Sequence, residues 1–318
     1  MWNDFKSRFI VECLNNKARV RWDIKHLTVS EGIGYGMLMA VSYGDKDTFN
    51  KLWRFYKHFL NEHNLMHWKV AEEGVIEKNA ATDSDEDCAI ALVMAHNKWI
   101  SSEEFVYEKE AKDLIKAIKE FEIEKNTYIV KPGDMWGGGS ITNISYFAPA
   151  YYKIFGEFTN DEEFWSKVVD KCYEIIKFNQ VINKSKGGLV SDWCNASGNK
   201  VSKSYVHGYD ATRTLWRIAI DYLWFNDLRA KSYCEKNNEW MTSQGFPEGI
   251  KDGYSLEGKP LSARQSITFI ASFAMTTILD EKLKQKFISK IKTVNPCNYF
   301  DWCFLLLSDL FLSDRFKI

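Results

Sequence analysis

The sequence predicts an all-α protein, an (α/α)6 barrel in which six inner helices are surrounded by six outer helices. Apolar residues recur at the 3.6-residue period over long stretches, and the 318 residues include only 5 prolines. Helices of two kinds also alternate along the chain. Helices that are apolar on most faces are buried in a large protein, whereas helices with one charged face lie at its surface.

The inner ring is predicted from the helices that are apolar on most faces. They are expected at residues 32–42, 83–99, 146–155, 210–225, 264–278 and 298–312. The helices with a charged face are expected at residues 2–14, 45–61, 103–124, 161–179, 227–243 and 281–294. Successive inner helices begin roughly 35 to 65 residues apart, which fits one helical hairpin per repeat. No proline- or serine-rich linker divides the chain, so we expect residues 1–318 to form a single domain.

Composition excludes several classes of partner. Lys and Arg total 42 against 43 Asp and Glu, a net charge of -1, so no overall field attracts nucleic acid or an anionic membrane. No apolar run approaches the ~20 residues that span a bilayer. The 7 cysteines are scattered without a C-x-x-C pair, which favours free thiols over disulfides or a zinc site. We therefore expect no cofactor, no metal, no nucleic acid and no membrane partner.

The loops that lead into the inner helices share one end of such a barrel, and unusual residues collect in them. These loops are expected at residues 28–35, 77–87, 131–146 and 192–213. The first contains Ser-Glu-Gly-Ile-Gly-Tyr-Gly at 30–36, and three glycines at the start of a helix suggest that backbone or ligand passes close by. Glu31 is either part of a site or a charge near a helix terminus that Ser30 caps.

Four carboxylates lie within five residues in the second loop, at Asp83, Asp85, Glu86 and Asp87. Capping by Thr82 or Asp83, together with the helix dipole, accounts for one or two acids but not for four. The alternatives are a solvated helix end and a site in which mutual repulsion raises the pKa of one carboxyl.

The other two loops carry an isolated tryptophan and a possible ion pair. Trp136 precedes the glycines 137–139, which cannot cover it, and exposed indole on a loop usually meets a flat apolar ligand face such as a sugar ring. Trp68 is a second candidate. Asp210 and Arg213 are three residues apart, so the cation can hold the carboxylate ionised, or the two form a surface ion pair. Acids in different environments beside aromatic rings point to general acid-base hydrolysis of a glycoside.

Several segments together resemble glycoside hydrolase family 8, and most closely its cellulase-type members. They are residues 30–36, 65–68, 81–99, 131–138, 142–143 with 145–150, and 209–213 with Trp216. They occur in the family's order over nearly the whole chain, and several motifs at matched spacing are far more specific than one. The resemblance implies an (α/α)6 barrel that cleaves β-1,4 glycans with inversion at the anomeric carbon.

The resemblance also implies roles for individual residues. Glu31 corresponds to the general acid, Asp210 to the general base, and Asp83 to the acid that grips the sugar at the cleavage site. Inversion then predicts that the carboxyl groups of Glu31 and Asp210 lie ~6.5 to 9.5 Å apart. Asp85, Glu86 and Asp87 are left for helix capping and local hydrogen bonds. The substrate-binding residues implied are Trp68, Trp136, Tyr146, Tyr209 and Arg213, with Tyr146 near the attacking water and Arg213 beside the base.

The expected activity is that of an endo-β-1,4-glucanase acting on cellulose or mixed-linkage β-glucan. Residues 72–80 are shorter than in cellulase-type members and lack a glycine-rich, acidic insertion, which leaves xylan and chitosan open as substrates. Two alternatives are not hydrolases: a terpene cyclase, whose Asp-rich motif resembles 83–87, and a glycan-binding module without catalysis. We expect a monomer with a polysaccharide or oligosaccharide as its partner. Because the chain starts almost at the first matching helix, we also expect an extracellular enzyme whose export segment has been removed.

Overall fold

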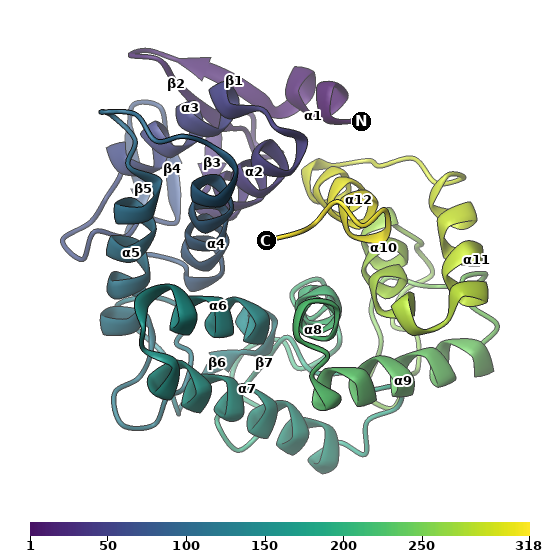
Figure 1. Cartoon of the computed structure of the whole chain (residues 1–318). Helices are drawn as coiled ribbons and strands as arrows, with labels where there is room; N and C mark the ends of the chain where they lie inside the picture. Colours follow the sequence, from purple (N-terminus) through teal and green to yellow (C-terminus); the bar gives the residue numbers. More distant parts are fainter.

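Twelve α-helices form a closed ring in the computed structural model, which describes residues 1–318 (Figure 1). The inner helices are α2 (Ser30–Tyr43), α4 (Thr82–Lys98), α6 (Pro149–Thr159), α8 (Thr212–Phe225), α10 (Ile267–Met275) and α12 (Tyr299–Leu312). The outer helices are α1 (Trp2–Phe9), α3 (Lys46–His58), α5 (Tyr107–Ala117), α7 (Glu162–Ile182), α9 (Leu228–Ser243) and α11 (Glu281–Ile291). The predicted (α/α)6 barrel is confirmed, and each expected helix is present.

Several helix ends differ from the prediction. The first outer helix ends at Phe9, because the chain turns there into a strand. Three inner helices begin two or three residues later than expected, and the residues before α6 form the 3₁₀ turn η2 (Ile144–Tyr146) instead. A π-helical turn, η1 (Ile118–Glu122), continues α5, and the 3₁₀ turn η3 (Thr276–Leu279) continues α10.

Seven short strands, which the sequence patterns did not indicate, build three antiparallel sheets. The strands are β1 (Ile10–Cys13), β2 (Lys17–Val20), β3 (Leu27–Val29), β4 (Lys69–Ala71), β5 (Gly74–Glu77), β6 (Thr142–Asn143) and β7 (Trp193–Cys194). Each has only two to four residues, too few to show an alternating pattern. In the sheet of β6 and β7, Asn143 pairs with Trp193, which joins two of the loops that lead into inner helices.

The glycines of α2 allow close packing against α4. A Cβ atom at Gly34 would lie 2.9 Å from the Cβ of Asp87 and 3.1 Å from the carbonyl oxygen of Ser84. Backbone therefore passes close to this helix, as the glycine run predicted. The contact fixes the first turns of α2 and α4 side by side, and these turns carry Glu31 and Asp83.

The predicted side-chain caps of these two helices are wrong. Val29 occupies the N-cap position of α2 and Ala81 that of α4, and neither provides a side-chain hydrogen bond. Ser30, Thr82 and Asp83 lie one residue or more inside the helices, where their side chains are past the capping position. Their polar groups are therefore available for other contacts.

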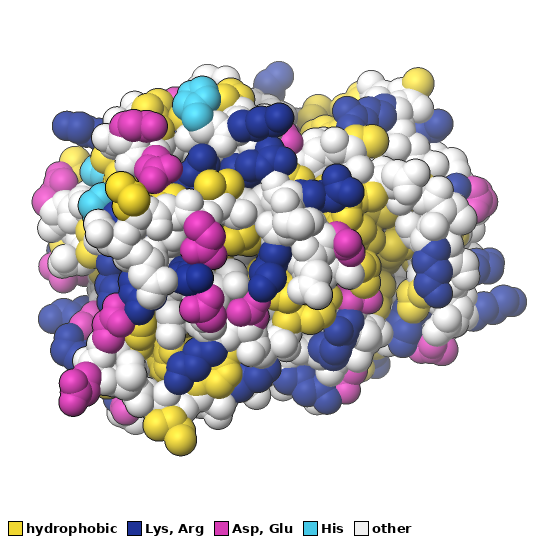
Figure 2. All heavy atoms as spheres, turned by 90° about the horizontal axis from the view of Figure 1, so that it is seen from above, with side chains coloured by type: hydrophobic (Ala, Val, Ile, Leu, Met, Phe, Trp, Pro, Cys, Tyr) yellow, Lys and Arg dark blue, Asp and Glu magenta, His cyan; other side chains and the backbone are white.

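The mixed surface charge and the free cysteines agree with what the composition predicted. Acidic and basic side chains are interspersed over the face of the molecule seen in Figure 2. All seven cysteines are free, and five of them are buried, as the sequence predicted. None of the helices combines the length and the apolarity that a membrane crossing needs.

Candidate active site

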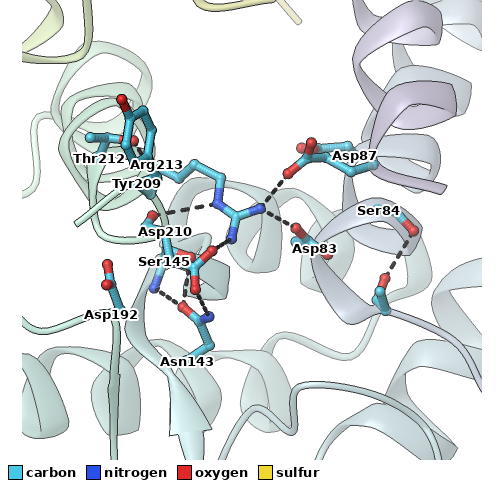
Figure 3. A network of polar contacts seen from close by, with 12 residues as sticks. Asp83, Ser84, Asp87, Asn143, Ser145, Asp192, Tyr209, Asp210, Thr212 and Arg213 are labelled. Atoms are coloured by element: carbon cyan, nitrogen blue, oxygen red, sulfur yellow. Dashed lines mark hydrogen bonds and ion pairs between the residues drawn. The ribbon is translucent and has the colours of Figure 1, made fainter. Parts of the chain in front are cut away.

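Three carboxylates from distant parts of the chain converge on the guanidinium of Arg213. Nη1 of Arg213 lies 2.6 Å from Oε2 of Glu31 and 2.6 Å from Oδ2 of Asp83, and Nη2 lies 2.9 Å from Oδ1 of Asp210. Glu31, Asp83 and Arg213 come from the first turns of α2, α4 and α8, and Asp210 from the turn before α8. Figure 3 shows Arg213 extending between Asp210 and Asp83. The sequence-predicted catalytic residues are thus brought together.

Exposure differs strongly within this group. The side chains of Arg213 and Asp83 are 4% and 3% exposed, whereas those of Glu31 and Asp210 are 18% and 37% exposed. The predicted pairing of Asp210 with Arg213 is confirmed, and the alternative of a surface ion pair is wrong because the cation is buried. One cation shared by three carboxylates leaves excess negative charge, which favours a proton on one of them.

Glu31 is the carboxyl best placed to hold that proton. Burial raises its pKa to about 7, Asp83 and Asp210 act in the same direction, and Arg213 opposes them. Tyr299 donates to Oε1 of Glu31 at 3.3 Å, while Arg213 holds Oε2. A carboxyl with this pKa can donate a proton at neutral pH.

Asp210 is held through both of its carboxylate oxygens. Oδ1 accepts from Arg213, and Oδ2 accepts from Nε1 of Trp193 at 2.9 Å and from Nδ2 of Asn143 at 3.3 Å. Neither Trp193 nor Tyr299 was predicted from the sequence as a site residue. Trp193 lies in one of the expected loops, and its position on that loop was the only signal that could have pointed to it.

Asp192 fixes the turn that carries Asp210. Its carboxylate accepts from the backbone N–H groups of Gly208 and Ala211 at 3.0 and 2.8 Å and from the hydroxyl of Ser204 at 2.6 Å. Burial raises the pKa of Asp192 to about 6, and the negative charge of Asp210 acts in the same direction. Asp192 therefore ties the chain on both sides of Asp210 to one point.

The remaining acids of α4 do not cap the helix, and they are not solvated. Asp85, Glu86 and Asp87 are fully buried. Asp85 accepts from the hydroxyl of Tyr56, Glu86 from that of Tyr152, and Asp87 from Nη2 of Arg217. These partners come from α3, α6 and α8, so the expected local hydrogen bonds are replaced by contacts between helices. The side-chain donor to each of these three acids therefore lies far from it in the sequence.

Aromatic rings line the site beside Asp210. Trp136 is partly buried because Trp193 stacks on it, with ring centroids 5.7 Å apart and an interplanar angle of 24°. The expectation that nothing covers Trp136 is therefore wrong, since the covering residue is distant in sequence. Nζ of Lys203 lies 4.4 Å from the ring centroid of Trp193 and 5.0 Å from that of Trp136. The ring of Tyr146 lies 5.1 Å from the guanidinium carbon of Arg213.

Trp68 and Tyr209 lie at other parts of the same end of the barrel. Trp68 is partly buried, and its carbonyl oxygen accepts from the backbone N–H of Ser30, beside Glu31. Tyr209 is 41% exposed, and its hydroxyl donates to Asp252 at 2.7 Å. No cluster of three or more His, Cys, Asp or Glu side chains is arranged to hold a metal ion.

Comparison with known proteins identifies the family. The profile of Glycosyl hydrolases family 8 matches residues 1–313. The chain belongs to this family. This family 8 chain is similar to Endoglucanase 2 of Ruminiclostridium josui, with 42% identity over 94% of its length. It is also similar to Endoglucanase A of Acetivibrio thermocellus, with 38% identity over 99% of its length. The Beta-1,3-1,4-glucanase from Paenibacillus sp. X4 has the same fold, with a TM-score of 0.90, 27% identity, and coverage of 99% of this chain and 90% of the other.

The family 8 chain covers 66% of the R. josui protein and 68% of the A. thermocellus protein, about two thirds of the length of each. Membership of this family excludes the terpene cyclase alternative, because the acidic run at 83–87 falls within the matched residues 1–313. The aspartates of that run are directed to Arg213, Tyr56 and Arg217.

Proposed function

We propose that this chain hydrolyses β-1,4-linked glucan, cellulose or mixed-linkage β-glucan, as an endo-acting enzyme that inverts the anomeric carbon. The observation that carries the proposal is the placement of Glu31 and Asp210 against opposite nitrogens of one guanidinium. One guanidinium keeps the two carboxylates apart while holding both at one site. Inverting glycosidases need their two carboxyl groups ~6.5 to 9.5 Å apart, because a water must fit beside the base. For Glu31 and Asp210 this separation stays a prediction.

Glu31 is the general acid in this proposal. It protonates the glycosidic oxygen as the bond to the anomeric carbon breaks, so the leaving sugar departs as a neutral alcohol. Oε1 is the oxygen suited to carry the proton, since Arg213 donates to Oε2 and Tyr299 makes only a long contact to Oε1. A bound sugar removes water from the part of Glu31 that is exposed here, which favours the protonated form further.

Asp210 is the general base. It takes a proton from a water that attacks the anomeric carbon on the face opposite the leaving group, so one displacement completes the reaction and no glycosyl-enzyme forms. Arg213 donates to one of its carboxylate oxygens and Trp193 to the other, so the carboxylate is held in place for this task. The ring of Tyr146 lies against Arg213 at this point, where its hydroxyl can help hold the water.

Asp83 and the aromatic rings bind the substrate in this proposal. Asp83 is almost completely buried under Arg213, and we assign it the hydrogen bond to the sugar at the cleavage site. Trp68 and Trp136 offer indole faces on which the C–H face of a sugar ring can stack. Tyr209, beside Asp210, is the further substrate contact. The names of the two endoglucanases and of the β-1,3-1,4-glucanase support glucan over xylan or chitosan.

The test is a comparison of polymers combined with the stereochemistry of the product. Release of reducing ends is measured on carboxymethylcellulose, mixed-linkage β-glucan, xylan and chitosan, with Glu31→Gln as the inactive control. Proton NMR of the first products follows the anomeric configuration. We expect the highest rate on a glucan and an α-anomer as the first product. A β-anomer would overturn inversion, and a higher rate on xylan or chitosan would overturn the substrate. Binding to glucan without release of reducing ends would instead support the binding-module alternative.

We also propose that residues 1–318 act as one catalytic domain, as a monomer and outside the cell. A polymeric glucan is too large to enter a cell, so an enzyme that cleaves it must meet it outside. Light scattering of the purified chain and the activity of culture supernatants against cell lysates test these two points. A stable dimer, or activity confined to the lysate, would contradict them.

A further inference from the structure

Trp193 occupies a position between the proposed base and the aromatic platform, which we define as the indoles of Trp136 and Trp193. Its Nε1 donates to Oδ2 of Asp210 at 2.9 Å, while its ring stacks on Trp136. We propose that Trp193 is a positioning residue that orients Asp210 and links this orientation to the binding of a sugar on the platform. The inference rests on the proposed function, in which Asp210 is the base.

The hydrogen bonds of Asp210 show why a second donor is needed. Arg213 contacts Oδ1, but the same guanidinium also contacts Glu31 and Asp83, so its position depends on the charge of three carboxylates. Trp193 contacts the other oxygen, and the indole N–H is a donor only, so it cannot change role when protons move. The two contacts together fix the plane of the carboxylate and leave its remaining lone pairs for the water.

The backbone holds Trp193 firmly enough for this task. Its own N–H donates to the carbonyl of Ser204 at 3.1 Å, and its carbonyl accepts from the hydroxyl of Ser191 at 3.0 Å. Trp193 also pairs with Asn143, whose side chain donates to the same oxygen of Asp210 at 3.3 Å. The neighbouring Asp192 anchors the turn of Asp210, so the indole and the carboxylate are held by one connected frame.

The ring of Trp193 connects this frame to the substrate groove. It stacks on Trp136 and lies 6.3 Å from the ring of Tyr146, and Nζ of Lys203 is 4.4 Å from its centroid. A sugar on the platform must contact or displace Lys203 and press on the stacked indoles. Because the indole is a rigid plane, its ring cannot shift without shifting its N–H relative to Asp210. Binding energy from the platform is thereby used in the transition state and increases kcat.

The experiment uses Trp193→Phe, which retains an aromatic ring and removes the N–H donor. We expect kcat on long cello-oligosaccharides to fall about 10- to 100-fold, the scale of one hydrogen bond to a charged group, with a smaller change in KM. The ratio of kcat between long and short oligosaccharides should also shrink.

Lys203→Met is the matched control, because it removes the cation over both indoles without touching Asp210. We expect it to change KM on long oligosaccharides while kcat on short oligosaccharides stays close to the wild-type value. The ratio of kcat between long and short oligosaccharides does not depend on the amount of folded enzyme, so it can be read even if Trp193→Phe folds poorly. Trp193→Tyr provides a second variant with a ring and no indole N–H.

The outcomes separate this inference from the proposed function. If the wild-type chain inverts β-glucan while both Trp193 variants retain its kcat and its chain-length ratio, the role of Trp193 is overturned and the proposed function stands. If kcat falls equally in Lys203→Met, the effect arises from the platform charge, and the inference is overturned as well. A wild-type chain that does not hydrolyse any of the glycans would overturn both proposals.

Discussion

Helix α4 carries two groups of carboxylates whose surroundings differ sharply. Asp83, in its first turn, joins Glu31 and Asp210 around Arg213 at the open end of the barrel. The next acids, Asp85, Glu86 and Asp87, extend into the interior, where they are fully buried. We call Asp85, Glu86, Asp87 and the nearby Glu122 the core acidic cluster. Residues adjacent in sequence are therefore divided between a chemical site and the packing between helices.

The partners of the two groups explain the difference. In the site, three carboxylates of unequal exposure share one cation, so a change at any of them alters the charge felt by the others. In the core acidic cluster, Asp85, Glu86 and Asp87 each have a separate donor. Burial raises the pKa of Glu122 well above its usual range, and the negative charge of Asp85 acts in the same direction. The carboxylates of the site therefore influence one another through Arg213, whereas Asp85, Glu86 and Asp87 each have a partner of their own.

The largest effect is expected from the two proposed catalytic acids. Glu31→Gln and Asp210→Asn should each lower kcat by ~10² to 10⁴-fold, because the acid and the base act in the transition state. Both side chains are partly exposed, so the melting temperature should change little. Initial rates on β-glucan and thermal unfolding provide the two measurements. Near-normal turnover in either variant would show that the residue has a structural role and not a catalytic one.

Substitutions in the core acidic cluster should lower stability and leave activity largely unchanged. Asp87→Ala leaves Arg217 charged and without its carboxylate in a site where both side chains are 0% exposed. Breaking such a pair should lower the free energy of unfolding by ~3 to 5 kcal/mol, measured by denaturant titration. The matched control is Asp113→Ala, which removes an exposed pair with Lys109 and should cost under ~1 kcal/mol. Activity per folded molecule should be retained, and a loss of turnover at unchanged stability would contradict the division.

The periodic pattern of the sequence was sufficient to predict the ring of helices, because an apolar face or a charged face persists over several turns. It also placed Glu31, Asp83 and Asp210 on loops at one end. It could not indicate Trp193, whose importance depends on strand pairing between β6 and β7, or the contact of Asp87 with Arg217. Both arise from residues far apart in the chain. Trp136 was expected to be bare for the same reason, since local sequence contains no record of its stacking partner.

The pH dependence of stability should reveal the core cluster. Burial raises the pKa of Asp85 to about 8, far above the ordinary value of ~3.9 expected in the unfolded chain. The folded state therefore binds more protons than the unfolded state between these values, and the free energy of unfolding falls as pH rises through this window. Asp85→Asn is neutral at every pH and should lose less stability between about pH 5 and pH 8. The variant leaves the neighbouring residues Tyr56 and Glu122 unchanged. Parallel curves for variant and wild type would contradict the assignment.

The pH dependence of activity should reveal the site instead. Glu31 must be protonated to act as the acid, and its pKa is raised to about 7. Above that pH, kcat/KM should fall by about tenfold per pH unit, because the protonated fraction falls in proportion. Asp85→Asn serves as the control and should leave this basic limb in place, since Asp85 belongs to the core cluster. A basic limb that shifted in Asp85→Asn would show that Asp85 and Glu31 titrate together.

The smallest effect is expected at the edge of the site, where stacking replaces charge. Trp136→Ala removes one indole of the platform, and the loss of aromatic stacking should raise KM for long cello-oligosaccharides by about 2- to 10-fold. Because Trp193 covers one side of Trp136, the truncation also exposes Trp193, and a modest fall in kcat should accompany the change in KM. Trp165→Phe is a suitable control, since Trp165 is a buried core indole that stacks on Tyr152 and should affect stability without changing KM. Identical kinetics of Trp136→Ala and wild type on long and short oligosaccharides would show that the platform does not contact the substrate, and the site would then consist of the charged group alone.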